Sequence, residues 1–164
     1  MNDLTAAPAA PCRVLFICLG NICRSPAAEA VFRHIVSRNH AEKRFEIDSA
    51  GLIDYHEGEL PDSRMRQCAA ARGYHLTHRS RPITAADFER ADYIVAMDAD
   101  NVRRLRRLAP RPELNRKVIR LNAYLTQYND DCIPDPYYGT AADFSHVIDL
   151  LEDACQNLYK TLTD

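Results

Sequence analysis

Residues 13–26 read Arg-Val-Leu-Phe-Ile-Cys-Leu-Gly-Asn-Ile-Cys-Arg-Ser-Pro, and this stretch decides the fold. The apolar run that ends at Cys18 is typical of a buried parallel strand. Gly20-Asn21 forms a tight turn of residue types that accept left-handed backbone angles, and an amphipathic helix begins at Ser25 or Pro26. A strand, a tight loop and a helix in this order predict an anion site, because the loop amides converge on one point and the positive end of the helix faces it.

The rest of the chain alternates apolar runs of strand type with helical patterns. Further strands are expected at 45–49, 93–97 and 117–121, and further helices at 62–71, 84–90, 98–108 and 141–162. This alternation predicts a parallel sheet with helices on both faces. We expect a single three-layer α/β domain over residues 12–164, with a four-stranded sheet in the order 2-1-3-4. The Ala/Pro-rich residues 1–11 are expected to form a disordered tail.

Composition excludes several classes of protein. The 164 residues suit one domain, and a formal net charge of −2 argues against a protein that coats nucleic acid. No apolar run approaches the roughly 18 residues needed to cross a bilayer, and the start of the chain has neither the basic opening nor the apolar segment of a signal peptide. We therefore expect a cytoplasmic protein with reduced cysteines. The six cysteines include no CxxC pair and no zinc spacing, so we expect no metal.

Cys18 and Arg24 are the candidate reactive pair, with five residues between them. A buried cysteine is usually only a small apolar side chain. Here the loop amides, the helix N-terminus and Arg24 favour the thiolate, which is the nucleophilic form. Arg24 lies where a cation is unfavourable unless an anion is bound, and its fork suits two phosphate oxygens. Ser25 either caps the helix or stabilises the thiolate when it leaves phosphorus.

Residues 18–26, Cys-Leu-Gly-Asn-Ile-Cys-Arg-Ser-Pro, resemble the signature of the low-molecular-weight protein tyrosine phosphatases. Residues 135–139, Asp-Pro-Tyr-Tyr-Gly, resemble the general-acid loop of that family, and 48–51 and 97–98 are shorter matches. The resemblance implies hydrolysis of phosphotyrosine through a cysteinyl-phosphate on Cys18, with no cofactor. It assigns Asp135 the role of general acid and base, and the chemistry agrees, because a phenol oxygen needs a proton when it leaves.

The resemblance also implies roles for other residues. They are a phosphate-binding loop of Leu19, Gly20, Asn21, Ile22, Cys23 and Ser25, a substrate cleft of Tyr55, Tyr137 and Tyr138, and supporting positions at Ser49, His78 and Asp98. In relatives, Ser49 and His78 match positions that brace the loop asparagine, and Asp98 matches one that orients the arginine. Asp98 equally suits a helix cap. In some relatives the second loop cysteine forms a reversible disulfide with the nucleophile, and the paired tyrosines are phosphorylated.

Two other functions stay open from the sequence. An arsenate reductase of the same fold would relay a disulfide through a further cysteine pair near the third strand, but residues 91–120 contain no cysteine. A non-catalytic phosphotyrosine-binding module would need neither Cys18 nor Asp135. The expected partners are a phosphotyrosine-containing protein, for which a bacterial tyrosine kinase is one candidate, and phosphate or another oxyanion in the loop. Some bacterial relatives are secreted by unconventional routes, which leaves that destination open.

Overall fold

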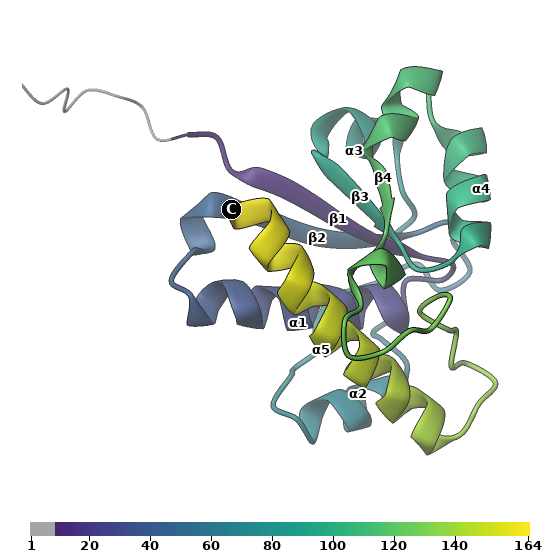
Figure 1. Ribbon diagram of the computed structural model, residues 1–164. Coiled ribbons are helices and arrows are strands. Elements are labelled where there is room, and N and C mark those ends of the chain that lie inside the picture. Colours follow the sequence, from purple (N-terminus) through teal and green to yellow (C-terminus); the bar gives the residue numbers. More distant parts are fainter. Residues whose placement is uncertain (1–8) are drawn as a thin grey trace, which may run out of the picture.

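Four parallel strands form the centre of the molecule, and the computed structural model describes residues 9–164 (Figure 1). The strands are β1 (Cys12–Cys18), β2 (Phe45–Gly51), β3 (Tyr93–Ala96) and β4 (Val118–Arg120). They are hydrogen-bonded in the order β2-β1-β3-β4, which confirms the predicted topology. Of the tail expected to be disordered, residues 1–8 lie outside the described residues, and 9–11 precede β1 without regular secondary structure.

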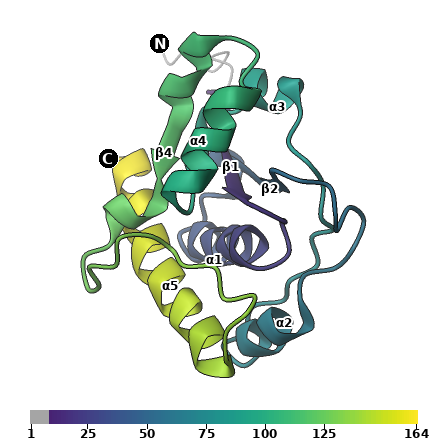
Figure 2. The ribbon, with the colours of Figure 1, turned by 90° about the vertical axis from the view of Figure 1, so that its right-hand side faces the viewer.

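Successive side chains of β1 point to opposite faces of the sheet, and each face carries a layer of helices. Val14 and Phe16 belong to the core formed with α1 (Arg24–Arg38), α2 (Ser63–Ala70) and α5 (Ala141–Thr163). Leu15 and Ile17 belong to the core on the other face, with α3 (Ala85–Arg90) and α4 (Ala99–Leu108). Figures 1 and 2 show these two layers on either side of the sheet, which confirms the three-layer expectation.

Helix α1 follows the predicted pattern and leaves its first turn open to an anion. Ala28, Val31, Phe32 and Ile35 are all buried, and Pro26 lies in the first turn. No side chain caps the helix at Cys23, and its first turn holds no acidic residue. The positive end of the helix dipole therefore has no protein anion of its own in that turn.

The structure adds elements that the sequence pattern did not predict. Three 3-10 helices, η1 (Glu42–Arg44), η2 (Pro112–Lys117) and η3 (Leu121–Tyr124), are too short for a periodicity to show. Strand β2 runs two residues further than expected, to Gly51, which pairs with Cys18. A Cβ at Gly51 would lie 3.1 Å from both the Asn21 Cβ and the Leu19 carbonyl oxygen. Only glycine lets β2 end this close to the loop that follows β1.

Parallel strands bring their carboxyl ends to one edge, and the chain collects its polar loops there. Cys18 ends β1, and Asp98 follows β3 as the N-cap of α4. The segment before α5 is tied to the same edge, because the Ile133 amide donates to the Met97 carbonyl oxygen at 2.9 Å. Within residues 9–164, no helix has the length and apolar character required to span a bilayer.

Candidate active site

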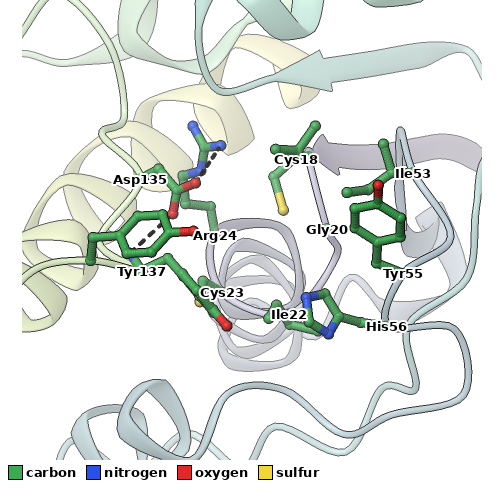
Figure 3. Close-up of a pocket in the computed structure, with 12 residues that line it drawn as sticks. Cys18, Gly20, Ile22, Cys23, Arg24, Ile53, Tyr55, His56, Asp135 and Tyr137 are labelled. Atoms are coloured by element: carbon green, nitrogen blue, oxygen red, sulfur yellow. Dashed lines mark hydrogen bonds and ion pairs between the residues drawn. The ribbon is translucent and has the colours of Figure 1, made fainter.

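A pocket opens at the carboxyl edge of the sheet, with Cys18 at its base (Figure 3). It is lined by Cys18, Leu19, Gly20, Ile22, Cys23, Arg24, Ile53, Tyr55, His56, Asp135, Tyr137 and Tyr138. The three residues predicted to be catalytic therefore share one cavity, although they come from two distant segments. The Ser25 amide and hydroxyl lie 3.4 Å and 3.0 Å from the Cys18 sulfur, so Ser25 is placed to stabilise a thiolate.

Arg24 is almost fully buried, with 3% of its side chain exposed, and it joins three segments. Its Nη1 donates to Asp98 Oδ2 at 2.6 Å and to the Ile133 carbonyl oxygen at 3.1 Å, while its Nη2 lies 3.7 Å from Asp135 Oδ2. Burial by itself lowers the pKa of Arg24, but the negative charges of Cys18, Asp98 and Asp135 raise it above its usual value. The guanidinium is therefore a fixed cation beside the sulfur.

Asp98 makes both contacts that the sequence left open, one with Arg24 and one as a helix cap. Its Oδ2 accepts from Arg24, and its Oδ1 accepts from the Asn101 amide at 2.7 Å as the N-cap of α4. Because Asp98 is fixed as the N-cap of α4, the Arg24 guanidinium that it binds is held by that helix.

Asp135 lines the pocket and remains half exposed. Its Oδ1 accepts from the Tyr137 amide at 3.1 Å, and the Gly139 amide closes a turn onto the Pro136 carbonyl oxygen at 2.8 Å. The acid loop, residues 135–139, therefore holds one carboxyl oxygen and leaves the other directed to Arg24. A carboxyl group in this place can exchange a proton with a ligand above Cys18.

Asn21 has a φ of 56° and is the centre of the loop's hydrogen bonds. Its Nδ2 donates to Ser25 Oγ at 2.7 Å and to Ser49 Oγ at 3.1 Å. Its Oδ1 accepts from His78 Nε2 at 2.9 Å and from the Arg81 amide at 3.1 Å. Ser49 and His78 thus lie where the family resemblance implies, against the loop asparagine.

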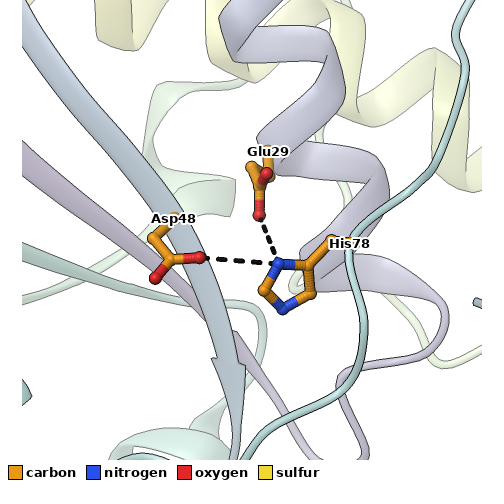
Figure 4. Close-up of side chains that lie close together, drawn as sticks. All are labelled: Glu29, Asp48 and His78. Carbon is orange, nitrogen blue, oxygen red and sulfur yellow. Dashed lines mark ion pairs between the residues drawn. The ribbon is translucent and has the colours of Figure 1, made fainter. Parts of the chain in front are cut away.

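Glu29 is part of this brace, although the sequence motifs did not indicate it. Its Oε1 accepts from Ser49 Oγ at 2.8 Å and lies 3.3 Å from His78 Nδ1, which is also 3.5 Å from Asp48 (Figure 4). One carboxylate oxygen each from Glu29 and Asp48 and one ring nitrogen of His78 lie within 4.8 Å of one another, which is close enough for a metal ion. However, His78 already uses both ring nitrogens on Asn21 and the carboxylates, so the geometry favours a brace. The signal in the sequence was a glutamate next to the apolar stripe of the expected helix, three residues before Phe32.

We expect Asn21→Ala to destabilise the protein and to weaken phosphate binding. Alanine is strained at this positive φ, and the bonds to Ser25, Ser49 and His78 are lost, so the free energy of unfolding should fall by about 3 kcal/mol. Asn21→Gly is the matched control, because glycine removes the same bonds without backbone strain and should recover about 1 kcal/mol. Urea unfolding and phosphate titration calorimetry measure both effects. An alanine variant as stable as the wild type would contradict this role.

The aromatic residues expected in the cleft are not equivalent. Tyr137 is partly buried, whereas Tyr55 and Tyr138 are 83% and 96% exposed, so these two stand at the rim and do not form deep walls. His56 also lines the pocket, and its ring centroid lies 6.4 Å from that of Tyr137. His56 was not among the predicted site residues, although its position beside Tyr55 in a long loop was a usable signal.

All six cysteines are free in the structure. Cys23 lines the pocket but is buried, and burial, together with the negative charges of Cys18, Asp62 and Asp135, raises the pKa of its thiol. Cys23 is therefore a protonated thiol that lies in the same pocket as the candidate nucleophile.

Comparisons with known proteins identify the family. Residues 13–164 match the family model described as low molecular weight phosphotyrosine protein phosphatase. A low molecular weight protein-tyrosine-phosphatase of Streptomyces coelicolor is 43% identical over 148 residues, which are 89% of this chain and 90% of that protein. A protein tyrosine phosphatase of Entamoeba histolytica, solved as a crystal structure, superposes with a TM-score of 0.90 at 45% identity over 93% of this chain and 97% of the other.

A Drosophila arginine phosphatase, also a crystal structure, superposes with a TM-score of 0.85 at 32% identity over 92% of this chain and 98% of its own. It shares the fold, and its name specifies a different phosphorylated side chain. The phosphotyrosine phosphatase family model covers the chain from Arg13, the second residue of β1, to the last residue. This chain therefore belongs to the low-molecular-weight phosphotyrosine protein phosphatase family.

Proposed function

We propose that this protein hydrolyses phosphotyrosine in proteins through a cysteinyl-phosphate on Cys18. One observation carries the proposal: the Cys18 sulfur, the Arg24 guanidinium and the Asp135 carboxyl group line the same pocket at the N-terminus of α1. A nucleophile, an anion clamp and a proton donor around one anion site are the groups that transfer a phosphoryl group from an aryl oxygen.

In the first step, the loop amides and Arg24 hold the phosphoryl oxygens while the Cys18 thiolate attacks phosphorus. The sulfur–phosphorus bond forms as the phosphorus–oxygen bond to the phenol breaks, and Asp135 gives its proton to the leaving oxygen. Arg24 contributes most as negative charge spreads over the equatorial oxygens, because its position is already set by Asp98 and by Ile133.

In the second step, the Asp135 carboxylate takes a proton from a water molecule, whose oxygen attacks phosphorus. The sulfur–phosphorus bond breaks, phosphate forms, and Cys18 leaves as a thiolate. The Ser25 hydroxyl, 3.0 Å from the sulfur, donates to that thiolate and makes it a better leaving group. All protons and bonds are accounted for by these four side chains, water and the substrate.

The walls of the pocket favour an aryl phosphate. Ile22, Ile53 and Tyr137 line the same pocket as Cys18, so a flat ring bound above the loop contacts apolar surface. A serine phosphate carries no ring to fill that space. A phosphoguanidine would place polar nitrogens against the same apolar surface, which costs binding energy.

The test is a panel of three peptides of one sequence that carry phosphotyrosine, phosphoserine or phosphoarginine. We expect kcat/KM for phosphotyrosine to exceed the other two by about 100-fold, since burying a ring is worth about 2–3 kcal/mol. Release of phosphate is measured at equal enzyme concentration. A preference for phosphoarginine would overturn the aryl assignment and point to the activity named for the Drosophila relative.

A further inference from the structure

Arg64 lies in the first turn of α2 and is outside the set of residues that line the pocket. Its guanidinium makes a two-point contact with Asp62, the N-cap of the same helix: Nε donates to Oδ1 at 3.0 Å and Nη2 donates to Oδ2 at 2.8 Å. A cation at a helix N-terminus is unfavourable without such a partner. Asp62 therefore fixes both the helix and the plane of the guanidinium.

The same guanidinium contacts two aromatic rings, that of Tyr137 in the acid loop and that of Phe144 in α5. Its central carbon lies 4.7 Å from the ring centroid of Phe144 and 5.4 Å from that of Tyr137. Phe144 is fully buried at the start of α5 and cannot move away. Asp62 thus holds the flat Arg64 guanidinium in place, and the Tyr137 ring packs against that guanidinium. We refer to this guanidinium as the Arg64 support.

Hydrogen bonds connect the two partners of Arg64 to the loop that follows β1 and to Asp135. On one side, the Asp62 amide donates to the Ile22 carbonyl oxygen of the phosphate-binding loop at 2.8 Å. On the other, the Tyr137 amide donates to Asp135 Oδ1 at 3.1 Å, and Figure 3 shows these two residues together at the edge of the pocket. Arg64 therefore connects the phosphate-binding loop, through Asp62, with the acid loop, through Tyr137.

We propose that Arg64 is a positioning residue that holds the acid loop over the phosphate-binding loop through Tyr137. The inference rests on the proposed function, because it concerns the proton that Asp135 gives to the leaving phenol. Without the support, Tyr137 and the carboxyl group that its amide holds are free to move from the leaving oxygen. A displacement of that kind affects proton transfer and leaves the anion site itself unchanged.

The test compares wild type with Arg64→Ala and Arg64→Lys on two substrates, phenyl phosphate and 4-nitrophenyl phosphate. We expect kcat/KM for phenyl phosphate to fall about tenfold in both variants and kcat/KM for the activated 4-nitrophenol ester to fall less than about threefold. Lysine keeps the charge but cannot make the two-point contact and the flat stack at once. The affinity for inorganic phosphate, measured by calorimetry, should match that of the wild type.

Arg106→Ala is the matched control, because Arg106 is an exposed helical arginine with no ion pair among residues 9–164. A double-mutant cycle completes the design: in a Tyr137→Ala background, Arg64→Ala should cause no further selective loss. Equal losses on both substrates, full rescue by lysine, or losses that add in the cycle would each overturn the inference. A wild-type protein that hydrolyses neither ester would instead overturn the proposed function, and with it this role.

Discussion

Cys18→Ser is expected to reduce hydrolysis of 4-nitrophenyl phosphate by at least about 10⁴-fold, since the variant lacks the thiol that we propose forms the covalent intermediate. A serine hydroxyl at this place is far less ionised than a thiol, although its size is similar. The loop amides and Arg24 do not depend on the sulfur, so inorganic phosphate should still bind with nearly unchanged affinity. Initial rates and phosphate calorimetry measure the two properties separately.

Cys12→Ser is the matched control for this loss. Cys12 lies at the opposite end of the same strand and is half-buried, so the substitution changes the same chemical group away from the pocket. The control should retain wild-type turnover. A Cys18→Ser variant with appreciable turnover would show that another group attacks phosphorus and would refute the covalent mechanism.

Asp135→Asn is expected to lower kcat/KM for phenyl phosphate by about 10²–10³-fold, which is the usual contribution of a positioned general acid. An amide cannot supply the proton that a poor leaving group requires. For 4-nitrophenyl phosphate the loss should be at most about tenfold, because that phenolate leaves without much help. Steady-state kinetics across a series of substituted phenyl phosphates measures the change as a steeper dependence on leaving-group pKa.

Asp131→Asn is the control here, because Asp131 is exposed and lies just before the acid loop in the sequence. It should leave the leaving-group dependence unchanged. If Asp135→Asn lowered kcat/KM for every ester by the same factor, the carboxyl group would be acting on the structure or on substrate charge. Its assignment as proton donor would then be wrong.

The fold could be predicted because its signals are local. The apolar run of β1, the turn at Gly20-Asn21 and the stripe of α1 each lie within one window of sequence, and alternation then implies a parallel sheet. The errors were at the ends and in short elements. The extension of β2 to Gly51 depends on pairing with β1, and η1, η2 and η3 are too short to carry a period.

The site was only partly predictable for the same physical reason. Cys18 and Arg24 are close in sequence, so their loop could be interpreted directly, whereas Asp135 was identified through the family resemblance. Glu29 and Arg64 act through contacts with residues far from them in the chain, such as Ser49 and Tyr137. No spacing rule reports such contacts. The sequence also could not predict that Tyr55 and Tyr138 are exposed at the rim, because exposure depends on how the loops pack.

The most direct test of the account is to look for the phosphoryl group on Cys18. Asp135→Asn is mixed with 4-nitrophenyl phosphate, because this ester still phosphorylates the variant while the slower attack by water lets the intermediate accumulate. The reaction is quenched in acid within one turnover, and the digested protein is analysed by mass spectrometry. We predict one added phosphoryl mass on the peptide that contains Cys18, and none after Cys18→Ser. An unmodified Cys18 peptide during turnover, or a phosphoryl group on another residue, would contradict the mechanism.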